Sequence, residues 1–214
     1  MSSKNKYIII LITSILIIYI LLNLMFNTIP KKVSGISNYD KNNYLKEYKD
    51  DLDSNLSIFP DKNLNFVKAK FKSSFQSNLF DNDGYIILKT NYNKEDFNNE
   101  INRLNELKQT IKSTCNKKYK EYTNYIKYDT KSYKYPAYIS IDGFAYTYEY
   151  ALINKKELEI IYIYLSYPDI NNNTYKKYLK KDKSYYKKNT INMYSMYSHS
   201  FDNNKSFVEV GDCN

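Results

Sequence analysis

Hydrophobic residues are unevenly distributed along this chain, and the longest apolar run lies near its start. Residues 7–26 contain no charged side chain and consist mostly of Ile, Leu, Tyr, Met and Phe. Twenty residues in an α-helix rise about 30 Å, which matches the hydrocarbon core of a bilayer. A helix also satisfies its own backbone groups, as lipid requires. The pattern therefore predicts a short cytoplasmic leader at 1–6 and a transmembrane helix over 7–26 that partners the lipid bilayer.

The charges that flank this helix indicate its orientation in the membrane only weakly. Lysines lie on both sides of the run, so the positive-inside rule favours a cytoplasmic N-terminus only slightly. A short polar leader before a long apolar run is typical of a signal-anchor, which would export the rest of the chain. The run exceeds the roughly 7–15 apolar residues of a cleaved signal peptide, although Val33-Ser34-Gly35 offers small residues for cleavage. We expect a single-pass cell-membrane protein with an extracytoplasmic C-terminal domain, and the inverted topology is the alternative.

Helical spacing of apolar residues predicts three short helices after a polar linker at 27–40. Their ranges are 42–53, 97–111 and 115–128. Asn93 followed by Asp96 resembles a capping box and would begin the second helix.

Alternating runs of β-branched and aromatic residues predict strands around two Asp-Gly pairs. Asp83-Gly84 would turn between strands 71–79 and 85–89, and Asp142-Gly143 between strands 137–141 and 144–153. Further strands are expected at 158–167 and 206–210. The order of strands, helix and strands favours one α+β domain over 41–214, with a mostly antiparallel sheet and one or two packed helices.

The net charge of +9 is concentrated in a few places. Residues 36–170 hold 20 basic and 19 acidic side chains, whereas residues 171–190 hold seven Lys and one Asp. The latter segment begins with three Asn and is expected to form an exposed basic loop. Its candidate contacts to an anionic partner are Lys176, Lys177, Lys180, Lys181, Lys183, Tyr185, Tyr186, Lys187 and Lys188.

Lysines in such a loop can neutralise phosphates, while tyrosines stack on bases or lie among lipid headgroups. Outside the cell, the partner would be an anionic envelope polymer or lipid headgroups. Inside the cell, nucleic acid would be the natural partner. An unspecific, solvated loop is the third reading, because the whole chain is rich in Lys and Tyr.

The chain has two cysteines, Cys115 and Cys213. In an exported domain they could pair, and the long loop that they close would stabilise the fold by about 3–5 kcal/mol. Two unpaired thiols are the alternative.

No motif for catalysis, metal binding or cofactor binding stands out. The single histidine, His199, and the four glycines provide no triad, nucleotide fingerprint or phosphate loop. The sequence therefore predicts no cofactor, no metal ligand and no catalytic residue, and it favours a binding or cell-envelope accessory role. An envelope hydrolase is the alternative, with Asp50, Asp51, Asp81 and Asp83 as its carboxylates.

Several apolar strings carry a resemblance to a known group of proteins. They are Phe59-Pro60, residues 84–89, the helix at 97–111 and residues 157–165. Together they resemble a loose group of uncharacterised membrane-anchored or lipoprotein ectodomains of low-GC Gram-positive bacteria. The resemblance implies an exported single domain over residues 40–185 and transfers no activity. Members of this group often carry a lipobox cysteine, which this chain lacks.

Overall fold

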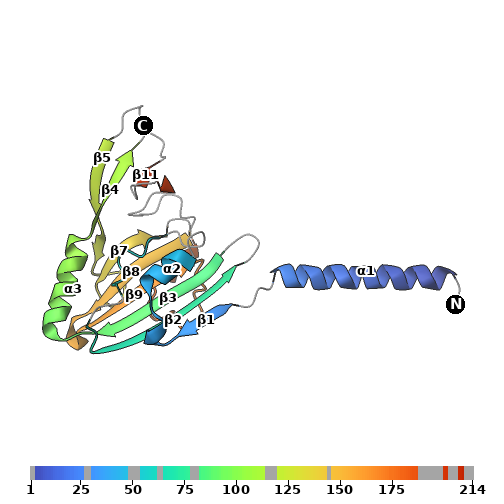
Figure 1. The fold of residues 1–214 in the computed structure, drawn as a ribbon, viewed down its shortest axis with the longest axis horizontal. Helices are drawn as coiled ribbons and strands as arrows, with labels where there is room; N and C mark the ends of the chain where they lie inside the picture. Colours follow the sequence, from blue (N-terminus) through green and yellow to red (C-terminus); the bar gives the residue numbers. More distant parts are fainter. Residues whose placement is uncertain are drawn as a thin grey trace.

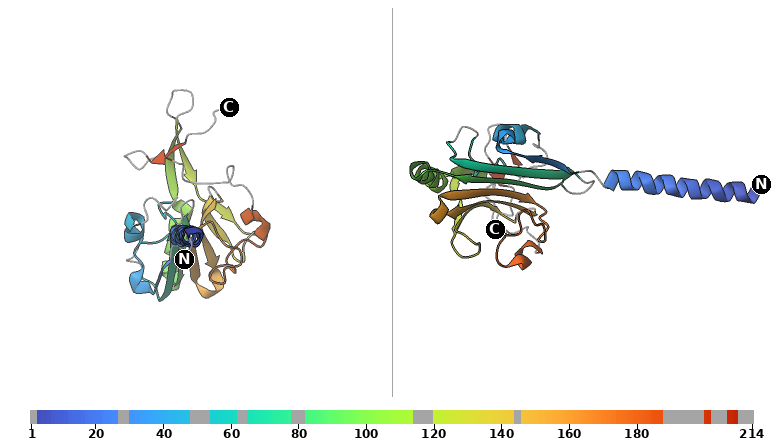
Figure 2. Two further views of the ribbon diagram at one scale, coloured as in Figure 1. Left: turned by 90° about the vertical axis from the view of Figure 1, so that its right-hand side faces the viewer. Right: turned by 90° about the horizontal axis from the view of Figure 1, so that it is seen from below.

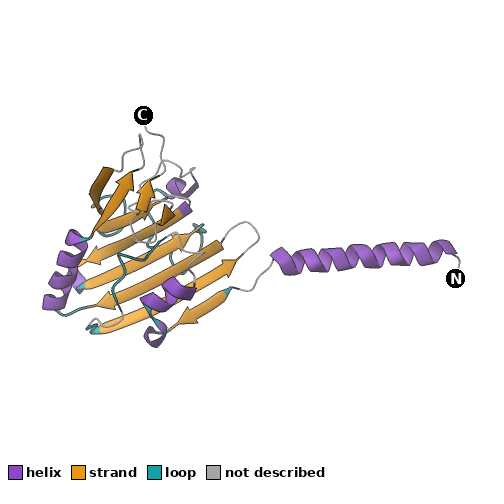
Figure 3. Cartoon of the chain, turned by 45° about the horizontal axis from the view of Figure 1, so that its top comes forward, coloured by secondary structure: helices purple, strands orange, loops and turns teal. Residues whose placement is uncertain are grey.

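A computed structural model describes most of the chain as an α+β fold. It covers residues 3–26, 30–47, 54–61, 65–77, 82–113, 120–143, 146–187, 200–201 and 207–209. The described residues form three α-helices, a seven-stranded antiparallel sheet and a second, four-stranded sheet (Figures 1 and 3). The α+β class expected from the sequence is therefore confirmed.

The first helix, α1 (Ser3–Phe26), contains the apolar run. Its segment Asn5–Leu22 has a mean hydropathy of 2.2, and none of it is buried. Figure 1 shows the helix extending away from the sheets. By length and composition α1 could cross a membrane, a property that an N-terminal signal sequence shares.

The main sheet has the strand order β1-β2-β3-β9-β8-β7-β6, and every neighbouring pair is antiparallel. Its strands are β1 (Lys31–Ser34), β2 (Lys68–Ser77), β3 (Asn82–Asn91), β6 (Lys127–Asp129), β7 (Ala137–Asp142), β8 (Thr147–Asn154) and β9 (Glu159–Ser166). Strand β1 lies within the range expected to be a linker, 27–40. It pairs with β2, and Val33 packs against the core, so the folded domain includes residues before 41.

Both faces of the sheet are covered at its centre. Along β9, Ile160, Tyr162 and Tyr164 face one core cluster. Ile161, Ile163 and Leu165 face the other. Because successive side chains of a strand point to opposite faces, a strand buried on both sides is apolar at nearly every position. This explains the continuous apolar run that the sequence shows at 158–167.

Different parts of the chain cover the two faces. Helix α2 (Lys41–Glu47), helix α3 (Lys94–Glu106) and the segment 54–61 pack on the first face. Residues 168–187 cover the second face, where Tyr178 and Tyr186 are buried. The views in Figure 2 place α2 and the short 3-10 helix η5 (Lys183–Lys187) on opposite sides of the sheet.

Helix α3 begins as expected and ends earlier. The Asn93 side chain accepts a hydrogen bond from the Asp96 backbone N–H at 2.9 Å, so the predicted cap is confirmed. The helix ends at Glu106, because Leu107 has an extended backbone. The prediction of a helix as far as residue 111 is therefore wrong.

The helix predicted at 115–128 is also wrong in its described part. Strand β4 (Lys108–Ser113) pairs with β5 (Lys120–Tyr125), and β6 follows. Strands β4 and β5 belong to the second sheet, together with β10 (Ser200–Phe201) and β11 (Phe207–Glu209). The strand order is β10-β11-β4-β5, and β11 runs parallel to β4. The β4–β5 pair is local, but β11 joins it from far along the chain, and a local helical period does not reveal such a partner.

The two Asp-Gly pairs have different roles. Gly143 adopts a φ of 93° between β7 and β8, and its N–H donates to the Thr147 carbonyl at 2.9 Å, so this predicted hairpin is confirmed. Asp142, the other predicted turn residue, is the last residue of β7 and pairs with Tyr148. Gly84 lies inside β3 opposite Phe75, not in a turn. A Cβ at Gly84 would lie 2.3 Å from Phe75 Cδ1, so glycine makes room for the ring. The predicted hairpin is confirmed, whereas its predicted turn residues are wrong.

Candidate functional site

In the part of the chain that the structure describes, the second face of the main sheet is exposed at its outer strands β1 and β2. On β2, Lys68, Lys70 and Lys72 share this face with Ile87, because Lys72 pairs with Ile87 across the strands. Lys32 of β1 pairs with Ser74 on the same face. These four lysines are exposed. Together with Lys89 of β3, which pairs with Lys70, they make up the lysine face.

Lys89 differs from the other members of the lysine face. Its ammonium lies 2.5 Å from a carboxylate oxygen of Glu159 on β9, at a hollow of about 180 Å³. The hydrogen bond to Glu159 raises the pKa of Lys89, although burial opposes that rise. Lys89 therefore forms an ion pair with Glu159, whereas the other four lysines of the lysine face are exposed.

The spacing of these lysines follows from strand geometry. Alternate residues of a strand lie about 6.8 Å apart, so Lys68, Lys70 and Lys72 form a regular row. Lys32 extends the positive charge onto the neighbouring strand. A regular row of cations suits an extended chain with repeated negative charges.

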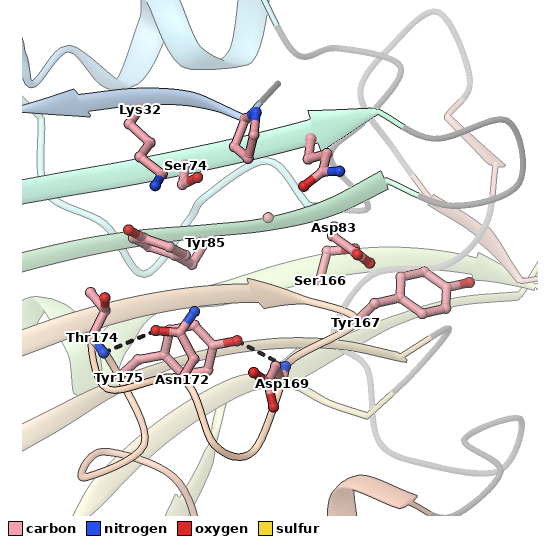
Figure 4. A pocket seen from close by; sticks show the side chains of 13 residues that line it. Lys32, Ser74, Asp83, Tyr85, Ser166, Tyr167, Asp169, Asn172, Thr174 and Tyr175 are labelled. Atoms are coloured by element: carbon pink, nitrogen blue, oxygen red, sulfur yellow. Dashed lines mark hydrogen bonds between the residues drawn. The ribbon is translucent and has the colours of Figure 1, made fainter. Parts of the chain in front are cut away.

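A pocket of about 360 Å³ adjoins the lysine face where β2 ends and β3 begins (Figure 4). Lys32 and Ser74 line it from the sheet, and Asp83 and Tyr85 line it from β3. Figure 4 shows the segment after β9 forming the facing wall. That wall consists of Tyr167, Asp169, Asn172, Thr174 and Tyr175, while Ser166, the last residue of β9, lines the pocket from the sheet.

Hydrogen bonds fix the facing wall of the pocket. The Tyr175 hydroxyl accepts from the Asp169 backbone N–H at 2.8 Å, and the Asn172 side chain accepts from the Thr174 N–H at 2.9 Å (Figure 4). The Tyr85 and Tyr175 rings lie 5.5 Å apart between centroids. Burial raises the pKa of Tyr175 to about 12, and the charges of Asp169 and Asp83 add to this rise. Both carboxylates line the same pocket as this ring, together with Lys32.

Tyr167 forms the rim of the pocket in an unusual conformation. Its φ is 46° and that of Tyr146 is 59°, in the left-handed region that tyrosine rarely adopts. The two rings stack at 5.0 Å. Such backbone strain often occurs at binding sites, and here it holds an exposed ring beside the pocket.

The predicted basic loop is a packed segment. The Lys180 ammonium lies 2.8 and 2.9 Å from the two carboxylate oxygens of Asp142, and 3.4 Å from the centre of the Tyr185 ring. Lys180 is 7% exposed and Tyr186 is 6% exposed. The expectation of an exposed loop is therefore wrong for these two residues. Lys180 pairs with Asp142, and Tyr186 packs in the core cluster on the second face of the sheet.

The other members of the predicted basic site differ in their exposure to solvent. Tyr185 is half-buried, Lys188 lies outside the described residues, and Lys176, Lys177, Lys181, Lys183 and Lys187 are exposed. Lys181 donates to the Lys131 carbonyl at 2.9 Å, and Lys177 lies over the Tyr178 ring. Contact of these exposed lysines with an anionic partner stays a prediction.

Most other candidate residues lie outside the described part of the chain. They are Cys115, Cys213, Asp50, Asp51, Asp81 and His199. Of the four carboxylates considered for a hydrolase, only Asp83 is described, and it lines the pocket. Among the described residues, no group of three or more Asp, Glu, His or Cys side chains could hold a metal ion.

Two titratable groups, the half-buried Arg103 and the buried Glu149, fix the segment 54–61 to the fold. Burial alone would lower the pKa of Arg103, but its two hydrogen bonds to Glu100 raise it, and Arg103 also donates to the carbonyls of Ser57 and Ile58 at 3.1 and 2.6 Å. Glu149 accepts from the Ile58 N–H at 3.0 Å, and burial raises its pKa. Each group lies against the covering segment, so we interpret both as structural.

The lysine face leaves a signal in the sequence. Lys68, Lys70 and Lys72 alternate with Ala69, Phe71 and Ser73, so one face of the strand is basic. The alternation predicted for 71–79 is confirmed for β2, yet it does not show whether the basic face is covered. The tertiary structure shows it: residues 168–187 cover the second face and pack with Tyr85 and Ile87 of β3, but this cluster includes no residue of β2.

Known proteins give no further guide to this site. No protein-family model, curated protein or solved structure matches the chain. The candidate site therefore rests on the geometry and charge of the described residues.

Proposed function

We propose that this chain is a single-pass membrane-anchored binding protein whose lysine face holds a phosphate-bearing polymer of the cell envelope. The observation that carries the proposal is the row of exposed lysines on an uncovered sheet face. Phosphodiesters carry one negative charge per repeat, which the regular lysine row complements. Such a partner needs no catalytic group.

The anchor in this proposal is α1 retained in the mature protein. Cleavage after Gly35 would remove β1, which pairs with β2 over four residues and contributes Val33 to the core. The same cleavage would remove Lys32 from the lysine face. An uncleaved α1 therefore agrees better with the fold than a removed signal peptide.

A charge-matched pair of variants tests the lysine face. The full chain in detergent micelles is titrated with poly(glycerol phosphate), and neutral dextran serves as the control polymer. The triple variant K68Q/K70Q/K72Q should bind about tenfold more weakly, and wild-type binding should fall steeply as salt rises. The variant K46Q/K94Q/K156Q removes the same charge from exposed residues of other elements and should bind like the wild type. Equal loss in both variants would contradict the proposal.

Protease shaving of intact cells that carry a C-terminal epitope tag tests the location. Loss of the tag while cytoplasmic proteins survive would agree with an extracytoplasmic domain. Survival of the tag in cells with opened walls would place the domain inside. That result would overturn the envelope partner and make nucleic acid the ligand to test on the lysine face.

A further inference from the structure

The pocket beside the lysine face combines groups of both charge signs. Asp83 and Asp169 contribute carboxylates, and Lys32 contributes an ammonium. In Figure 4 the Lys32 side chain descends into the pocket from the sheet, whereas Asp169 lies at the facing wall. A single ion of either sign would meet a like charge here. A ligand that carries a cation and an anion a few bonds apart would satisfy both ends.

The end of the pocket formed by the facing wall suits an organic ammonium ion. Tyr167, Tyr175 and Asp169 belong to that wall, and Tyr85 and Asp83 of β3 line the pocket from the sheet. Aromatic faces attract ammonium groups through their quadrupole, and neighbouring carboxylates strengthen that attraction. The raised pKa of Tyr175, which comes from burial and then from the charges of Asp169 and Asp83, agrees with a negative potential at this end.

The opposite end suits a phosphodiester. Lys32 belongs to the lysine face, and Ser74 adds a hydroxyl beside it. A phosphate held by Lys32 would extend the binding of phosphate groups along the lysine face into the pocket.

The covalent chain keeps the pocket close to the end of α1. Pro30 lines the pocket and follows Phe26, the last residue of α1, by four residues. Four residues span at most about 14 Å even when fully extended. If α1 crosses the membrane, Pro30 therefore lies within about 14 Å of the end of the spanning helix, close to the layer of lipid headgroups.

We propose that this pocket binds the headgroup of a zwitterionic aminophospholipid from the membrane that holds α1. The primary amine lies among the tyrosines, Asp83 and Asp169, and the phosphodiester contacts Lys32. This inference rests on the membrane anchor of the proposed function but not on its polymer. Its consequence is that the domain lies against the membrane with its lysine face adjoining the bilayer.

Soluble headgroups test the chemistry without interference from lipids around α1. The full chain in detergent micelles is titrated by calorimetry with glycerophosphoethanolamine, glycerol 3-phosphate and ethanolamine. Glycerophosphoethanolamine should bind about tenfold more tightly than either half. The variants D83N/D169N and K32Q should each lose about tenfold in affinity, whereas D61N, which removes an exposed carboxylate elsewhere, should not. Equal affinity for glycerol 3-phosphate, or unchanged binding by D83N/D169N, would overturn the proposal.

Nanodiscs then test the source of the ligand. In discs that contain phosphatidylethanolamine, the leaflet lipid should compete and weaken binding of soluble glycerophosphoethanolamine relative to phosphatidylcholine discs. No difference between the two discs would overturn the assignment to a membrane lipid. Because K68Q/K70Q/K72Q leaves the pocket intact, it should keep headgroup binding even if the polymer proposal fails.

Discussion

At the scale of single residues, the environment of each lysine decides its role. Lys180 and Lys177 lie three residues apart in the same segment, yet Lys180 pairs with buried Asp142 while Lys177 stays exposed. Burial lowers the pKa of Lys180, and the hydrogen bond with Asp142 opposes that change. Lys180 therefore acts as an internal counterion and not as a contact for an external anion.

The Lys180→Gln substitution should destabilise the fold and leave polymer affinity unchanged. It leaves Asp142 buried, with the Lys127 ammonium still 3.8 Å away. We expect a loss of about 3 kcal/mol in the free energy of unfolding, at the low end for breaking a buried pair. Urea unfolding of the full chain in detergent measures it, with Lys177→Gln as the control. A stable Lys180→Gln protein with weakened polymer binding would contradict this assignment.

Glu149 should give a specific pH dependence. Its pKa is raised in the folded state, so the folded protein holds this proton more tightly than the unfolded chain. The resulting stabilisation is fully present below about pH 4.5, the ordinary value, and is lost as pH rises through the raised folded-state pKa.

Glu149→Gln should remove this dependence, because the amide does not titrate. The difference in unfolding free energy, wild type minus variant, should fall as pH rises above 4.5, by at most about 1.4 kcal/mol per pH unit. Urea unfolding at pH 4 to 8 measures it. A difference that stays constant over this range would show that Glu149 titrates alike in both states.

At the scale of elements, close packing between neighbouring strands determines residue choice. Gly84 and Phe75 occupy paired positions on β3 and β2, and the Phe75 ring occupies the space that a Cβ at Gly84 would need. This pair also lies beside the pocket, since Gly84 lines it. A change here should disturb both the hairpin and the site.

Gly84→Ala should therefore destabilise the domain by about 1–3 kcal/mol through overpacking. Thermal unfolding of the full chain in detergent, followed by circular dichroism, measures the effect. The double variant G84A/F75L has a smaller side chain opposite the new methyl group and should recover part of the loss. An unchanged melting temperature for Gly84→Ala would show that the ring moves aside at no cost.

At the scale of the whole molecule, the apolar helix and the sheet are joined by a short stretch of chain. Strand β1 begins at Lys31, five residues after α1 ends, and forms the edge of the main sheet. It also carries Lys32, which belongs to both the lysine face and the pocket. In the proposed function, membrane attachment and binding would therefore depend on neighbouring residues of the chain.

Two truncated chains test how much β1 contributes to the stability of the folded domain. A chain that starts at Pro30 keeps β1, whereas one that starts at Ile36 loses its four pairs with β2 and the core contact of Val33. We expect the shorter chain to melt at a lower temperature, by roughly 4–8 °C for each kcal/mol lost. Circular dichroism of both purified chains measures this difference. Equal melting temperatures would mean that β1 adds nothing to the folded domain.

Sequence patterns predicted the features that depend on neighbouring residues. The apolar run of α1, the Asn93 cap of α3 and the turn at Gly143 follow from local backbone geometry, so each was recognisable in advance. The end of the helix at Glu106 and the strands β4 and β5 were missed. These two strands pair with each other, but their sheet also includes β11, which lies far along the chain.

The sequence by itself determined an apolar helix, an α+β class and most strands of the main sheet. Tertiary structure alone decided which charges face outward. Lys180 is buried because it pairs with Asp142, 38 residues away in the chain. The lysine face is exposed because residues 168–187 cover the second face of the sheet only as far as β3. Local patterns record the periodicity of a strand, but burial depends on what the rest of the chain places against it.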